Sequence, residues 1–131
     1  QNQLDKALEY FERSLSLSEQ LLKESATPQN RRDLTYTLNR IGDVYVSQNQ
    51  LDKALEYFER SLSLSEQLLK ESATPQNRRD LTYTLNRIGD VYVSQNQLDK
   101  ALEYFERDLS FREQLLKESA TMFLKTNSTR H

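Results

Sequence analysis

The feature that most constrains the fold of this chain is an internal repeat with a period of 47 residues. Residues 1–47 and 48–94 are identical at every position, and residues 95–121 repeat the first part of the unit with three substitutions. Such a repeat predicts stacked copies of one supersecondary unit, in which each copy contacts mainly its neighbours. We therefore divide the chain into units 1–47 and 48–94, a partial unit 95–121, and a C-terminal tail of residues 122–131.

Each unit predicts one amphipathic helix that we call helix B, placed at about 3–26 and again at 50–72. Its apolar residues recur at spacings of three, four and seven, which is the pattern of a helix with a buried stripe. A second apolar row widens the stripe, as expected for a helix packed between two neighbours. In the second unit the stripe consists of Leu51, Ala54, Leu55, Phe58, Leu62 and Leu69, and the second row consists of Tyr57, Leu64 and Leu68.

The other helix of the unit, helix A, is predicted at 28–47 and 75–94. A threonine followed by a proline comes first, and these are residues that favour the N-cap and the first turn of a helix. The buried stripe is expected to contain Leu34, Leu38, Val44, Ile41 and Tyr45. Asn49 lies in the turn that follows, where asparagine tolerates the left-handed conformation that ends a helix.

The predicted architecture is an all-α solenoid of five helices in the order B-A-B-A-B. Only two glycines and two prolines occur in 131 residues, which fits a nearly all-helical chain. The first helix B lacks a preceding helix A, so its stripe, including Leu4, Ala7 and Phe11, is a candidate site of association. At the other end, Asp108 and Arg112 replace serines and indicate a polar cap. We expect the tail to extend the last helix by a turn or two, with Phe111, Met122 and Phe123 folding back on it.

Several coupled positions carry a resemblance to a known family. In helix A these are Leu38, Ile41-Gly42 and Tyr45, which recur at Leu85, Ile88-Gly89 and Tyr92; in helix B they are Ala7 and Phe11, Ala54 and Phe58, and Ala101 and Phe105. This pattern resembles the tetratricopeptide repeat. The period exceeds the family's usual 34 residues, so both helices should be longer, as in long-repeat bacterial members. HEAT and armadillo repeats also have periods near 47, but the spacings and the position of the proline favour the tetratricopeptide reading. We expect Gly42 to allow close approach of helix B beside Ala54.

The resemblance implies a right-handed superhelix whose A helices line a concave groove that holds a peptide or a partner helix. The corresponding positions in this chain are Tyr36, Asn39, Asp43, Val46 and Ser47, with their copies Tyr83, Asn86, Asp90, Val93 and Ser94. To these we add Arg32 and Arg79, one turn before the tyrosines, which could bind an acidic residue. Asparagine can bond a peptide backbone, and tyrosine supplies a rigid surface with a polar end. Arg40 and Arg87 could bind an acidic residue. The alternative is a solvated face, with Arg40 and Asp43 pairing along the helix.

Other classes of function are disfavoured by what the sequence lacks. It has no cysteine, and its one histidine is the terminal His131, so we expect no enzyme, no cofactor and no metal site. A net charge of −2 argues against a nucleic-acid partner. No apolar run approaches the ~20 residues of a membrane span. The lack of cysteine also fits a cytoplasmic protein.

The sequence thus predicts a scaffold that binds another protein or a peptide segment in its groove. A second hypothesis is a self-assembling structural repeat, a homo-oligomer formed by swapping or head-to-tail stacking through the unpaired N-terminal helix. A third is that the chain is the sensor or scaffold end of a larger regulatory protein.

Overall fold

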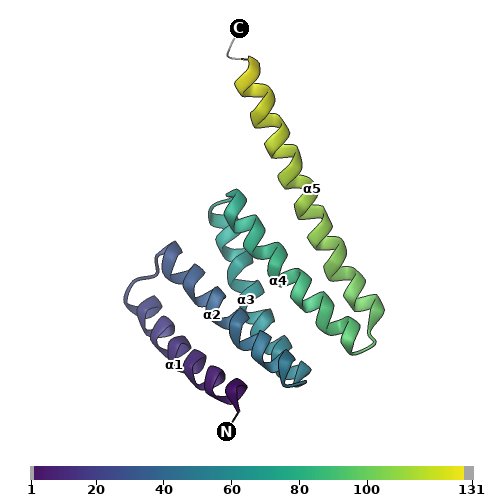
Figure 1. The fold of residues 1–131 in the computed structure, drawn as a ribbon. Helices are drawn as coiled ribbons and strands as arrows, with labels where there is room; N and C mark the ends of the chain where they lie inside the picture. The colour runs from purple at the N-terminus through teal and green to yellow at the C-terminus, as the bar shows by residue number, and fades with distance from the viewer. Residues whose placement is uncertain (1, 129–131) are drawn as a thin grey trace.

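A computed structural model describes residues 2–128, and within this range the chain is an array of five α-helices without a strand. Consecutive helices run antiparallel and lie side by side in chain order (Figure 1). This confirms the predicted all-α order B-A-B-A-B. The helices are α1 (Gln3–Glu24), α2 (Pro28–Ser47), α3 (Leu51–Glu71), α4 (Pro75–Ser94) and α5 (Leu98–Ser128).

The helix ends follow from local chemistry. The hydroxyls of Thr27 and Thr74 accept hydrogen bonds from backbone amides three residues later, so both threonines cap their helices as predicted. Asn49 has a φ of 60°, the left-handed conformation expected in this turn. The predicted ends of helix B are slightly too late, because Ser25 and Ser72 have extended backbones and end α1 and α3.

The core consists of the apolar stripes of all five helices, packed between neighbouring helices. Helix α3 lies between α2 and α4, and both Phe58 and Ala54 are fully buried there. Leu38 and Ile41 of α2 are also fully buried. The stripes read from the sequence therefore face the core, and a single hairpin would leave part of each stripe in water.

Gly42 of α2 lies against the ring of Phe58 in α3, so the two helices approach closely at this glycine. A Cβ placed on Gly42 would come within 2.6 Å of the Cε1 atom of Phe58, and the three nearest atoms all belong to that ring. The copy, Gly89, faces Phe105 of α5 in the same way, at 2.4 Å from Cε1.

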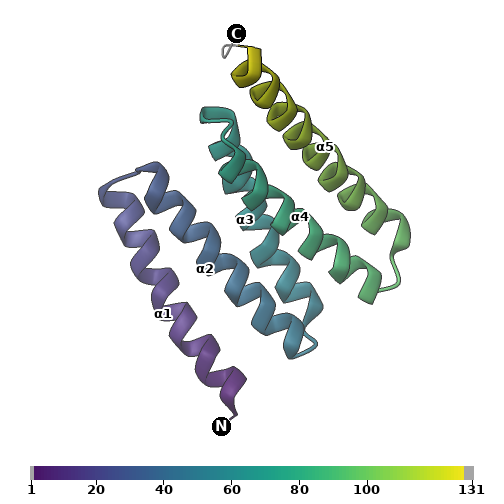
Figure 2. The same cartoon turned by 45° about the horizontal axis from the view of Figure 1, so that its top comes forward.

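Helix α5 is 31 residues long. It runs antiparallel to α4, and its C-terminal part continues past the N-terminal end of α4 (Figures 1 and 2). The tail thus extends the last helix, as expected. Met122 and Phe123 are exposed on this extension and do not fold back, whereas Phe111 is half-buried against the core. The helix is unbroken between residues 121 and 122, and the boundary that we draw there remains a prediction. Arg112 donates to the carboxylate of Asp108 at 2.9 Å. In the described part of the chain, no helix has the length and apolar character that crossing a membrane requires.

The two glycines offer a matched stability test. Gly42→Ala gains about 1 kcal/mol of helix propensity, but the new methyl clashes with a fully buried ring, which costs about 1–3 kcal/mol. We expect a net loss for Gly42→Ala. Phe105 is only half-buried and can move aside, so Gly89→Ala should lose less or gain stability. Urea unfolding of the two variants measures the difference, and equal effects would contradict the proposed role of the Phe58 contact.

Candidate functional site

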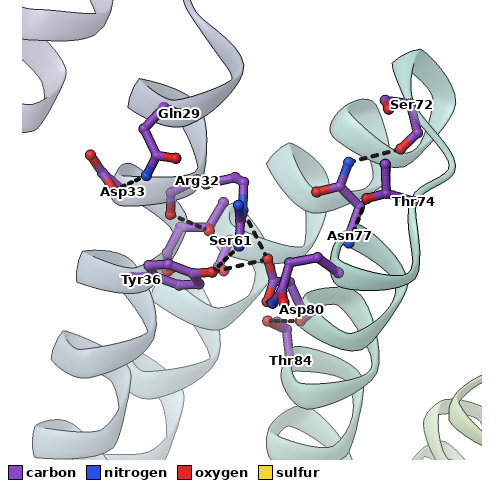
Figure 3. Close-up of polar contacts among 12 residues, drawn as sticks. Gln29, Arg32, Asp33, Tyr36, Ser61, Ser72, Thr74, Asn77, Asp80 and Thr84 are labelled. Carbon is purple, nitrogen blue, oxygen red and sulfur yellow. Dashed lines mark hydrogen bonds and ion pairs between the residues drawn. The ribbon is translucent and has the colours of Figure 1, made fainter.

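One face of the array is formed by α2 and α4, which are joined there by polar side chains (Figure 3). At one end, Arg32 and Tyr36 of α2 both point toward Asp80 of α4. The Nε atom of Arg32 and the hydroxyl of Tyr36 each donate to Oδ2 of Asp80 at 3.2 Å. Arg32 also donates to the Tyr36 hydroxyl at 2.6 Å. Three side chains from two repeats therefore form one connected group.

A second group joins the same helices further along. The hydroxyl of Tyr83 donates to Oδ2 of Asp43 at 3.1 Å, and the Nε atom of Arg87 donates to Oδ1 of Asp43 at 2.9 Å. Arg87 also lies 4.0 Å from Asp90 on its own helix. Asp43 therefore pairs across the repeat boundary, in place of the pairing with Arg40 along the helix that the sequence left open.

Between the two groups lies a hollow of about 340 Å³. Tyr36 and Tyr83 are 37% and 46% exposed, so their rings offer surface to a ligand. The hollow is lined by Tyr36, Asn39, Arg40, Asp43, Asp80 and Tyr83. Four of the residues predicted for the groove thus come together, and Arg32 bonds two residues of the lining, Asp80 and Tyr36.

Asn39 lines the hollow and also makes a contact between repeats. It is only 7% exposed, and its Nδ2 atom donates to the hydroxyl of Thr84 at 3.1 Å. The sequence places Asn39 on the groove side of helix A but gives no sign of how closely α4 approaches it. Its copy Asn86 is half-buried, and in the described part of the chain no further helix A follows α4 to offer it the same bond.

The other predicted groove residues lie outside the hollow. Ser47 lines a separate depression with Phe11 and Arg40, and Val46 is half-buried. The remaining four are on the outer part of α4, and all of them are exposed: Arg79, Asp90, Val93 and Ser94.

Asp80 is the site residue that the sequence reading missed. Its copy Asp33 comes directly after two arginines, so both read as members of an ordinary mixed-charge helix surface. The available signal was the spacing of three residues from Asp80 to Tyr83, which puts both on one face of a helix.

Burial raises the pKa of the Tyr36 phenol above its ordinary value of 10.0, and the charge of Asp80 raises it further. Burial and the charge of Asp43 likewise raise the pKa of Tyr83. Both phenols are therefore protonated at neutral pH and act as donors to the two carboxylates. The carboxylates in turn hold the rings in fixed orientations at the edge of the hollow.

Within residues 2–128, no cluster of three or more His, Cys, Asp or Glu side chains could hold a metal ion. The histidine noted in the sequence, His131, lies outside the described residues. The chemistry of the hollow is that of hydrogen bonding, ion pairing and contact with aromatic rings.

The sequence of the chain matches the model of a known protein family. A model described as "Tetratricopeptide repeat" matches residues 1–67 and 33–114. The chain belongs to the tetratricopeptide repeat family. This decides against the HEAT alternative and confirms the resemblance seen in the sequence. Repeats of the family generally mediate protein–protein interaction and are typically non-catalytic.

One solved structure supports the same fold. The crystal structure of BtubC (BKLC) from P. vanneervenii is similar with a TM-score of 0.65 and 18% sequence identity. The similarity covers 87% of this chain and 42% of that chain, so the tetratricopeptide array described here spans less than half of that protein. At this identity the likeness shows the fold alone. No curated protein matches the chain.

The two asparagines test whether the bond from Asn39 to Thr84 stabilises the contact between repeats. Asn39→Ala removes a buried hydrogen bond to Thr84 and should lower the free energy of unfolding by about 1–2 kcal/mol. Asn86→Ala, the same change at the copy that makes no bond to a following helix A, should change it by less than about 0.5 kcal/mol. Equal losses in chemical denaturation would show that the bond to Thr84 does not join the repeats.

The tyrosine pKa shifts predict a dependence of stability on alkaline pH. A phenol with a higher pKa in the folded chain binds its proton more tightly there. Its contribution to stability is therefore fully present below pH 10 and is lost as the pH rises through the folded pKa. Phenolate absorbance should appear at higher pH in the folded chain than in urea. The displacement should shrink when Tyr36 and Tyr83 are both changed to Phe; an unchanged displacement would contradict the assignment.

Proposed function

We propose that this tetratricopeptide array is a binding module that receives a segment of another protein in the hollow between α2 and α4. The observation that carries the proposal is the pair of exposed, oriented rings of Tyr36 and Tyr83 on either side of this hollow. Tyrosine and arginine are enriched in protein interfaces because they supply contact area and polar bonds at a low cost in conformational entropy. The family's general role in protein–protein interaction supports the same conclusion.

The charges of the hollow favour a partner with an acidic group. Asp43 and Asp80 are already neutralised by Arg87 and Arg32. Arg40 is exposed at the rim, over the ring of Phe11 at 5.8 Å, and makes no ion pair within residues 2–128. It is therefore available to a carboxylate of the bound segment, while the two tyrosines contact its apolar side chains.

The proposal gives the chain a role in binding, without catalysis and without a resident cofactor. We also place it in the cytoplasm, a location that the lack of cysteine supports.

The test is a selection of random 12-residue peptides displayed on phage, followed by titration of the selected peptides against the chain. Changing Tyr36 and Tyr83 together to Ala should weaken binding at least tenfold, because both aromatic contacts are lost. Phe123→Ala is the matched control, since Phe123 is another exposed ring, far along α5 from the hollow. Far-ultraviolet circular dichroism checks that both variants remain helical.

Two results would contradict the groove. One is that peptides selected on the chain bind the double variant with unchanged affinity. The other is that Phe123→Ala weakens binding as much as the double change does.

A further inference from the structure

Helix α5 carries a row of exposed apolar side chains at intervals of seven residues. Leu109, Leu116 and Phe123 are 55%, 71% and 65% exposed, and Leu102, one interval earlier, is exposed as well. Seven residues are close to two turns of an α-helix, so these side chains lie along one face. A row with this period is typical of a helix that packs lengthwise against another helix.

The row is completed by residues in which the chain departs from its repeat. Helix α4 begins with Pro75, but the corresponding residue, Met122, lies inside α5, which runs on to Ser128 without a break. Phe123, the last member of the row, stands where the repeat has Gln76. The apolar face of α5 is therefore longer than that of the other B helices, and it owes this length to substitutions that only α5 has.

Another substitution separates this face from the one that a helix A covers inside the array. Ser65 of α3 is 3% exposed, between α2 and α4. Its copy in α5 is Arg112, which is exposed and donates to Asp108 at 2.9 Å. A long charged side chain at this position hinders the close packing of a helix A. The face therefore suits a helix that places a different neighbour opposite Arg112.

The charges beside the row make α5 complementary to itself. Glu113 and Lys117 are exposed, and within residues 2–128 neither makes an ion pair. Since Glu113 comes three residues before Leu116 and Lys117 comes one residue after it, both lie on the same side of the row. A second α5 that runs antiparallel, with the twofold axis at Leu116, brings Glu113 of each copy opposite Lys117 of the other.

We propose that α5 is the contact surface of a homodimer, in which the two α5 helices run antiparallel and cross at Leu116. Leu116 then meets Leu116 of the second copy, and Leu109 meets its Phe123, so apolar side chains from both copies leave water together. Arg112 lies opposite Ser119 of the second copy, a small residue that leaves it room. A parallel pair would instead put Arg112 against Arg112, and the like charges would oppose it.

The extension of α5 gives this pairing its room. Its C-terminal part continues past the N-terminal end of α4 (Figures 1 and 2). In a pair centred at Leu116, the part of α5 that packs on α4 lies beside the extension of the second copy. The contact uses no residue of the hollow between α2 and α4, so one dimer would present two hollows to a bivalent partner.

Sedimentation equilibrium of the intact chain tests the dimer. The mass should rise with concentration from that of one chain to that of two. Leu116→Glu should raise the dissociation constant of the dimer at least tenfold, because two charges would then meet at its centre. Leu17→Glu is the matched control, the same change at a leucine of α1 that is 62% exposed, and it should leave the association unchanged.

A charge exchange tests which residues meet. Glu113→Arg puts like charges opposite Lys117 of the second copy, and Lys117→Glu puts like charges opposite its Glu113. Each variant alone should dimerise more weakly than the original chain. When the two variants are mixed, a dimer should form again, because each altered charge then meets its opposite. Partial unfolding of either variant cannot imitate this recovery.

Single thiols test the orientation, since the chain contains no cysteine of its own. A mixture of Leu109→Cys and Phe123→Cys should, on mild oxidation, form mainly the disulfide that joins the two different variants. A parallel pair would instead favour the disulfides between like chains.

The proposal is overturned if the chain stays a monomer at millimolar concentration, or if Leu116→Glu dimerises as well as the original chain. It is also overturned if mixing the two charge variants restores no dimer, or if like chains cross-link in preference to unlike ones. Loss of association in Leu17→Glu would place the contact on α1 and would equally overturn it. The peptide experiment on the hollow is independent, since Tyr36 and Tyr83 lie on α2 and α4.

Discussion

The structure depends on helices that are apolar on two sides, so that each must be covered by a helix before it and a helix after it. Phe58 expresses this constraint most directly: its ring lies against the backbone of Gly42, and α4 closes over the other side of its helix. One hairpin leaves too much apolar surface in water to be stable alone, and stacking supplies the rest of the burial. The polar groups that join α2 to α4 then fix how far one repeat is displaced relative to the next.

Much of this fold could be predicted because the decisive signals are local. Pro28 and Thr27 start a helix through their own chemistry, and Asn49 ends the turn through its tolerance of a positive φ. The stripes of Leu, Ile and Phe give the buried faces through a period that the helix itself imposes. The tail was harder to predict. Nothing in residues 122–128 opposes a helix, but only packing could have held Met122 and Phe123 against the array.

The candidate site was predicted in part because it is made by two repeats together. A helical pattern places Tyr36 and Asn39 on one side of α2, but it does not give the distance to α4. Asn39 therefore proved to be a contact between repeats, and Asp80, on the second helix, was not recognised. The same limit applies to charge: Arg40 and Arg87 have identical neighbours in the sequence, and only the presence of Asp43 opposite Arg87 makes their surroundings differ.

The identity of the units also bears on how the chain reaches this arrangement. Helices α2 and α4 have the same sequence, so α1 can pair with either, and the contacts alone do not distinguish the two choices. The mistaken pairing closes a loop over residues 25–74 in place of residues 25–27. Loop-closure entropy separates them by only about 2–3 kcal/mol. The short connection therefore supplies the preference for the correct neighbour that sequence differences supply in less uniform arrays.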